Sequence, residues 1–353
     1  MQTQNNTTRQ RRMRALWRTR ACAAGLCVGT QLFLSGCAVG MPLALSSAWL
    51  AAIPVFPFAA WLTARSRRAL TQPAGKAIRL GYAFLFAALL GCAGFTLLSM
   101  TAFAAQTLAQ QAQALWLEAT ALAAVALCAC CGSTGATRLS FALRYCLPLL
   151  VLGLSVAALP MRVPAGLFPI LGAGAKPLAL AALAMLFGAA PALMLMLPPQ
   201  MTEDEPPANI PPARFFLVRV LCGALGGALL LFLTSACTTY ESIAQSMTWG
   251  ARLRMAAGNQ PHEGVLQMFL TLFKLMAMLL LAANMLCAAR HALVLVFPRL
   301  KSGHAGTMLC TALLAALLLM RSLFGDAPAL LAAPAIAAAA ALAALLLGRG
   351  PRP

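Results

Sequence analysis

The sequence predicts an all-α polytopic membrane protein with ten transmembrane helices, arranged as two inverted repeats of five helices each. Three observations support this fold class. The 353-residue chain is 61% hydrophobic, only 9% of its residues are charged, and its apolar runs reach spanning length. A helix needs about twenty apolar residues to cross a bilayer. No span-free domain is left that could bind nucleic acid, despite the net charge of +19.

The expected organisation is a basic cytoplasmic tail, 1–20, followed by a single transmembrane domain, 21–353. The ten apolar runs lie at 21–43, 48–64, 81–104, 115–131, 141–160, 177–198, 215–237, 264–289, 305–324 and 328–348. Two outer connections are long enough to carry structure of their own. We expect an irregular or re-entrant link at 161–177 and a surface helix within 238–258, where apolar residues recur at near-helical spacing.

Basic residues alternate with the predicted spans in a way that orients the chain. With the N-terminus inside, the cytoplasmic segments hold twenty Lys and Arg residues and the outer loops hold five. Cytoplasmic loops of membrane proteins carry such an excess. Both termini are therefore predicted to be cytoplasmic, in a bacterial cell membrane.

The first predicted span also resembles a lipoprotein signal, because an arginine-rich start precedes an apolar stretch that ends at Leu34, Ser35, Gly36 and Cys37. The apolar run continues past Cys37, and further spans follow rather than a soluble domain. We interpret the segment as an uncleaved first span, with processing at Cys37 as the alternative.

Ten spans divide into repeats at 21–160 and 177–348, and five helices per half require opposite orientations of the two halves. Each half begins with a helix that small and helix-breaking residues weaken near the middle of the membrane. The candidate ligand-binding residues are Gly29, Thr30 and Gln31 in the first span and Gly188, Ala189 and Pro191 in the sixth. The alternative is that the small residues only permit close helix packing.

Other chemistry is not indicated by the sequence. No nucleophile–base arrangement, phosphate-binding loop or paired carboxylate occurs, so an enzyme is not expected. The densest cysteine group, Cys128, Cys130 and Cys131, lacks a second ligand pair at zinc-site spacing. The sequence therefore predicts no metal and no cofactor.

Several blocks resemble the endospore germination permeases, which are the B subunits of germinant receptors. The block FGAAPALMLMLPPQM at 187–201 resembles the sixth span of that family. The segment 247–258 is similar to its outer-loop helix, and 40–45 with 48–53 to its junction between spans one and two. The acidic residue often found before the Leu-Pro of span six is absent here, and Ala192 lies at about that position.

This resemblance implies a leucine-transporter-like fold of the amino acid–polyamine–organocation superfamily, with broken helices one and six. It implies a small nutrient ligand, such as an amino acid, between those two helices. It also implies A and C germinant-receptor subunits as partners in the spore inner membrane. The function expected first is therefore a germinant receptor subunit that senses a nutrient and passes solute or ions.

Two other functions stay open. One is a secondary amino-acid or cation transporter of the same fold, and the other is a membrane scaffold subunit whose ligand site has degenerated.

Lys274 lies about ten residues into the eighth predicted span, 264–289, so its side chain does not easily reach water at either end. A charge at this depth is expensive and by default functional. In a fold of this kind, Lys274 can replace a bound sodium ion and hold the first span. The alternative is that it faces a partner subunit or an inner vestibule.

Overall fold

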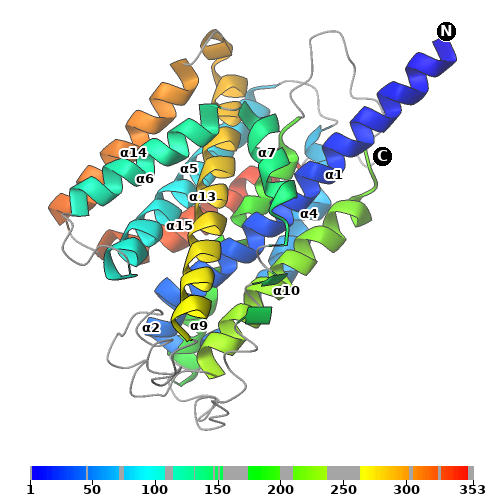
Figure 1. Ribbon diagram of the computed structural model, residues 1–353. Helices are drawn as coiled ribbons and strands as arrows, with labels where there is room; N and C mark the ends of the chain where they lie inside the picture. The colour runs from blue at the N-terminus through cyan, green and yellow to red at the C-terminus, as the bar shows by residue number, and fades with distance from the viewer. Residues whose placement is uncertain are drawn as a thin grey trace.

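The computed structural model describes residues 2–44, 47–70, 75–107, 114–130, 132–145, 148–149, 152–153, 174–198, 210–236, 263–301, 305–324 and 327–348. These residues form helices and short connections, and no strand occurs among them. The bundle is elongated, and its helices run roughly along two crossing directions (Figure 1). The elements are α1 (Gln2–Ser35), η1 (Gly36–Gly40), α2 (Met41–Ala44), α3 (Ala48–Ala51), α4 (Val55–Leu70), α5 (Lys76–Thr107), α6 (Ala114–Cys130), α7 (Gly132–Ala142), α9 (Ala175–Met185), η5 (Leu186–Met196), α10 (Ala213–Ala236), α13 (Glu263–Val296), η6 (Pro298–Lys301), α14 (Ala305–Phe324) and α15 (Ala327–Leu347).

Within the described ranges, six helices are long and apolar enough to cross a membrane. They are Met13–Ala44, Ala48–Leu70, Lys76–Ala104, Ala175–Met196, Ala213–Ser235 and Leu272–Val296. The pair α6 and α7 is a seventh candidate, and shorter apolar helices lie at Ala305–Leu319 and Ala332–Leu347. The chain is thus an all-helical integral membrane protein.

Nine of the ten predicted spans coincide with described helices, and the fifth, 141–160, lies largely outside the described residues. The predicted outer segment 238–258 lies outside them as well, as does nearly all of 161–177. One difference concerns the link after the fourth span, which was predicted as a loop and instead forms α7. Gly132, the first residue of this helix, has a φ of 78°, so the chain turns there at a residue without a Cβ.

The contacts between helices repeat from one half to the other. Helix α1 packs along α10, and η5 packs along α4. The first contact joins span one to span seven, and the second joins span six to span two. Spans six and seven of the second half correspond to spans one and two of the first, so the two contacts are equivalent. Likewise α5 packs on α6, and α13 packs on α14. An inverted repeat of five helices produces this pattern.

Glycines let α1 and α10 approach at backbone distance. A methyl group added to Gly223 would overlap the carbonyl oxygen of Gly25, and one added to Gly227 would overlap that of Gly29. Small residues four apart on facing helices are a common device for packing helices in lipid, where the hydrophobic effect does not drive helices together.

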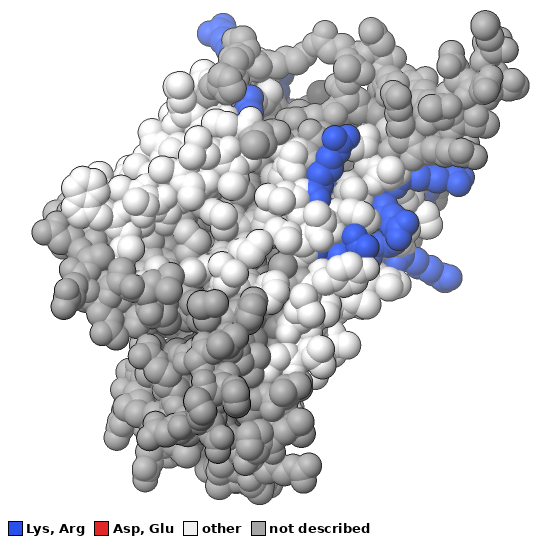
Figure 2. Space-filling model, in the orientation of Figure 1, with Lys and Arg blue, Asp and Glu red and all other residues white. Residues whose placement is uncertain are grey.

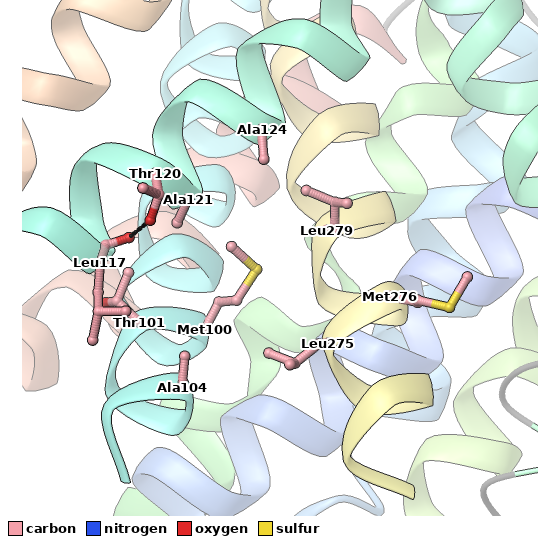
Figure 3. Close-up of a pocket in the computed structure, with 10 residues that line it drawn as sticks. All are labelled: Met100, Thr101, Ala104, Leu117, Thr120, Ala121, Ala124, Leu275, Met276 and Leu279. Atoms are coloured by element: carbon pink, nitrogen blue, oxygen red, sulfur yellow. Dashed lines mark hydrogen bonds between the residues drawn. The ribbon is translucent and has the colours of Figure 1, made fainter. Parts of the chain in front are cut away.

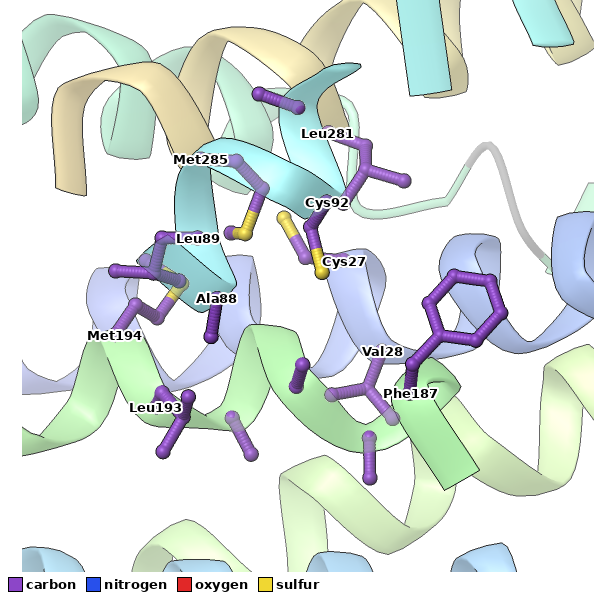
Figure 4. Packing of buried hydrophobic residues seen from close by; sticks show 14 of the residues in the cluster. Cys27, Val28, Ala88, Leu89, Cys92, Phe187, Leu193, Met194, Leu281 and Met285 are labelled. Carbon is purple, nitrogen blue, oxygen red and sulfur yellow. The ribbon is translucent and has the colours of Figure 1, made fainter. Parts of the chain in front are cut away.

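The core lies where α1, α5, η5 and α13 meet. Figure 4 shows buried side chains from all four helices in one cluster, among them Val28, Leu89, Phe187 and Met285. Phe95 and Phe187 form an edge-to-face pair with ring centroids 4.8 Å apart. These four helices also surround the predicted ligand residues. The core and the candidate site are therefore formed by the same helices.

Candidate functional site

The first span does not break where the sequence predicted. Helix α1 runs without interruption through Gly29, Thr30 and Gln31, and the irregular segment is the π-helical turn η1. Gly29 is part of the close contact with α10, so its missing side chain serves packing while the helix stays regular. A π-turn widens the helix locally and occurs frequently at functional sites.

The sixth span changes its helical form as predicted. After α9, residues Leu186–Met196 continue as a 3-10 helix that contains Pro191. Proline lacks the N–H that an α-helical bond would need, and the tighter 3-10 winding alters the bonding pattern around it. All residues from Phe187 to Met196, including Ala189 and Pro191, are buried.

Gly188 allows the sixth span to lie directly against the first. A Cβ at this position would stand 3.1 Å from Leu32 Cα and 3.2 Å from Ser35 Oγ. The face of η5 that carries Gly188 therefore packs against the segment of α1 that follows Gln31. This is the pairing of spans one and six that the sequence predicted, with Gly29 on a different side of α1.

Gln31 is a fully buried amide in the middle of the first span, with 0% of its surface exposed. Its Oε1 lies 3.1 Å from Thr96 Oγ1 on α5, and the same hydroxyl lies 2.7 Å from the carbonyl oxygen of Cys92. A hydroxyl has one proton, so Thr96 donates to one of these two acceptors. If it donates to Cys92, the Gln31 amide turns over and donates to Thr96.

Either orientation leaves part of the Gln31 amide without a partner. As drawn, Gln31 Nε2 has no hydrogen bond, and the neighbouring Thr30 Oγ1, whose residue is 3% exposed, has none either. Unpaired buried polar atoms cost about 1–3 kcal/mol each in a folded protein. Both residues lie on α1, and the unpaired Gln31 amide has the capacity to bind the polar end of a small ligand.

Lys274 lies at the junction of α13, α1 and α5, and only 6% of its surface is exposed. Its Nζ stands 4.0 Å from the ring centroid of Phe103 on α5 and 5.4 Å from that of Phe33 on α1. Both rings attract the ammonium through their π faces. The lysine thus joins three helices, and it contacts the first span two residues beyond Gln31.

Sequence reasoning missed the partners of both groups. Thr96, Phe33 and Phe103 are ordinary apolar-helix residues in the sequence, and no local pattern marks them. Their roles depend on which helix faces meet, since Thr96 is 65 positions from Gln31.

Arg20 links the first span to the end of η5. Its guanidinium donates a hydrogen bond to the carbonyl oxygen of Met194 near the end of η5. This helix ends at Met196, and Pro198, two residues further along, has no N–H to offer the preceding carbonyls. A cation from α1 therefore caps the end of the sixth span, which is a favourable place for positive charge.

A separate cavity of about 300 Å³ lies between α5, α6 and α13. Figure 3 shows its ten lining residues, none of which is a predicted site residue. The two lining hydroxyls are already bonded, Thr101 to the Leu98 carbonyl at 3.1 Å and Thr120 to the Trp116 carbonyl at 2.9 Å. The cavity therefore offers apolar surface, and it adjoins Phe103 and Lys274 through their neighbours Ala104 and Leu275.

Metal-ligating side chains are not grouped in the described part of the chain, where no three His, Cys, Asp or Glu residues could hold an ion together.

No protein-family model and no curated protein sequence matches the chain. Solved structures do match it. One is Mhp1, a nucleobase-cation-symport-1 family transporter, in a closed conformation with bromovinylhydantoin bound; the TM-score is 0.60 at 12% identity, covering 86% of this chain and 71% of that one. Two others are structures of a manganese transporter from Eremococcus coleocola. One is in complex with an aromatic bis-isothiourea compound, with a TM-score of 0.52 at 14% identity. The other is a single-residue mutant, with a TM-score of 0.57 at 13% identity.

Both manganese transporter structures are matched over 95% of this chain and 77% of their own length. All three similar structures are transporters and not enzymes. At these identities the likeness concerns architecture. The chain has the leucine-transporter-like fold of these membrane transporters.

Proposed function

We propose that this protein is a secondary transporter-like membrane protein that binds a small molecule where the first, third and sixth spans meet. The observation that carries the proposal is the buried Gln31 amide, which keeps unmet hydrogen-bonding capacity at the face of α1 beside Thr96. The fold, shared with three transporter structures, supports it. An amide and hydroxyls at such a site suit the polar end of a small solute, and an amino acid is the class we propose.

Lys274 has a proposed role beside this site. We assign it the positive charge that holds the first span against α5 and α13, in place of a bound cation. Its position over the Phe33 and Phe103 rings supports a role in helix coupling. Activity should then not require sodium.

The placement in the membrane is also proposed. The excess of Lys and Arg in alternate connections supports cytoplasmic termini in a bacterial cell membrane. Two repeats, 21–160 and 177–348, would enclose the ligand, and the paired contacts α1–α10 and η5–α4 support this division.

We propose transport, and not the germinant receptor function, as the function that is best supported. The similar structures are transporters, and no match points to spore germination or to A and C subunits. The unmet capacity of Gln31 also favours an intact site over a degenerate one.

The test is ligand binding by purified protein against a panel of the twenty common amino acids, read as a rise in melting temperature, followed by uptake of the labelled hit into proteoliposomes. Gln31→Leu should weaken binding about tenfold or more, because a buried hydrogen bond to ligand is lost. The melting temperature without ligand should stay nearly unchanged, because the Thr96 hydroxyl can still donate to the Cys92 carbonyl.

Thr63→Val is the matched control, since Thr63 is equally buried but bonds only to Ala59 of its own helix at 2.7 Å. It should bind like the unaltered protein. Undiminished binding by Gln31→Leu would contradict the site, and no response to any amino acid would contradict the substrate class.

A further inference from the structure

Two arginines, one on α1 and one in the turn that follows α7, share one aromatic ring near the beginning of the first span. Arg18 of α1 has its guanidinium carbon 5.9 Å from the ring centroid of Phe141 on α7, and that of Arg144 lies 4.3 Å from the same centroid. Arg144 also stands 4.4 Å from the ring of Tyr145. We call Arg18, Phe141, Arg144 and Tyr145 the arginine–aromatic cluster.

Arg144 is held in a defined orientation. Its Nη1 donates to the carbonyl oxygen of Phe141 at 3.0 Å, and its Nη2 donates to the Tyr145 hydroxyl at 2.8 Å. A guanidinium has five N–H donors in a fixed plane, so three remain for another acceptor. Such a preorganised fork suits the oxygens of a phosphate or carboxylate.

Acidic residues are scarce in the described part of the protein. The described ranges contain only two, Glu118 on α6 and Glu263 at the start of α13. Two guanidiniums on one ring repel each other, and an anion between them turns that repulsion into attraction.

The position of the cluster points to a lipid. Arg18 lies five residues inside the candidate span Met13–Ala44, about 7–8 Å along the helix from its start. Tyr145 is 57% exposed, and tyrosines are enriched at the level of the headgroups. On the face drawn in Figure 2, Lys and Arg gather toward the end of the molecule where α1 begins, and no described Asp or Glu appears.

We propose that the arginine–aromatic cluster binds the phosphate of an anionic phospholipid in the leaflet where the first span begins. Arg18 and Arg144 contact the phosphate oxygens, while Phe141 and Tyr145 hold the two guanidiniums apart and lie at the membrane interface. The lipid would join α1 to α7, two helices whose contact brings two positive charges together. This proposal depends on the membrane placement and not on the ligand site at Gln31.

The test uses the full-length protein in a neutral detergent, with thermal unfolding followed as dioleoylphosphatidylglycerol, dioleoylphosphatidylcholine or inorganic phosphate is added. Phosphatidylglycerol should raise the melting temperature in a saturable way, and the other two should not. Arg18→Gln and Arg144→Gln should each weaken the apparent affinity for phosphatidylglycerol about fivefold, as expected for one basic residue at a lipid surface. The double variant should lose the saturable response.

The matched control is Arg214→Gln, which removes the same charge from an exposed position in the first turn of α10. Its affinity should change less than twofold. If Arg144→Gln aggregates, Arg144→Lys replaces it, because lysine keeps the charge and loses the planar fork, and it should show an intermediate loss.

Three results would overturn the proposal. An equal loss in Arg214→Gln would reduce the effect to general surface charge. An equal rise with inorganic phosphate would assign the site to a soluble anion. A response to phosphatidylglycerol that appears only after Glu203, Asp204 and Glu205 are neutralised would assign the cluster to the chain's own acidic segment.

Discussion

Gln31 and Lys274 are two polar side chains that the bundle buries along its central helices. Gln31 sits on α1 against Thr96, with an amide atom that finds no protein partner. Lys274 sits on α13 against two aromatic rings from α1 and α5. Gln31 belongs to the first span and Lys274 contacts that span at Phe33, so a change at either one acts on the position of the span.

Removing the charge of Lys274 tests its role most directly. Lys274→Met fills similar space without an ammonium, so the protein should insert normally but lose most of its ligand binding and uptake, to roughly a tenth or less. Lys274→Arg keeps the cation over both rings and should retain more activity. Insertion is measured by fluorescence-detected size exclusion, and activity by uptake into proteoliposomes in sodium and in choline buffer.

Full activity of Lys274→Met would show that the charge is not needed. A requirement for sodium in the unaltered protein would contradict the proposal that Lys274 replaces a bound cation.

At the scale of elements, close backbone contacts at glycines join the first span to helices of the second half. Helix α1 meets α10 at glycines, and it meets η5 at Gly188. Arg20 adds a charged hydrogen bond from α1 to the end of η5. Since α1 takes part in both contacts, its packing also sets the position of Gln31.

The glycine contact predicts a sharp difference between two similar substitutions. Gly223→Ala places a methyl group against the carbonyl oxygen of Gly25, and backbone on both sides leaves no room to relax. We expect a loss of about 3 kcal/mol or more in stability, visible as a large drop in melting temperature or as aggregation.

Gly94→Ala is the control within α5, because its new methyl group would meet only Leu314 and Leu317 side chains at 3.7 Å. That is ordinary contact, and alanine favours helix over glycine by roughly 1 kcal/mol. The melting temperature should hold or rise. Equal behaviour of the two variants would mean that α1 and α10 do not pack at their glycines.

At the scale of the whole molecule, matching contacts in the two halves indicate one architecture used twice in opposite directions. The contacts α5–α6 and α13–α14 repeat in the same way as α1–α10 and η5–α4. A site between α1 and η5 then lies near the axis that relates the halves, where small movements of either half change access to it.

The proposed orientation is open to a direct measurement. Reporter fusions at residue 1 and residue 353 should report a cytoplasmic location, and reporters inserted within 161–176 or 238–258 should report an external one. The reason is the excess of basic residues in the alternate connections. A periplasmic signal from either terminus would contradict ten spans with both ends inside.

The sequence by itself determined the class of the protein, the position of nine described helices and the weak point of the sixth span, because hydrophobic length and proline act locally. It also singled out Gln31 and Lys274, since polar side chains within apolar runs are rare. Only the tertiary structure decided that the first span becomes π-helical at Gly36–Gly40, that Gly29 packs against α10, and that Thr96, Phe33 and Phe103 contact Gln31 and Lys274. The physical reason is that helices in lipid are apolar on every side. Composition therefore shows that a segment spans the membrane, while the choice of facing partners depends on close packing between residues far apart in the chain.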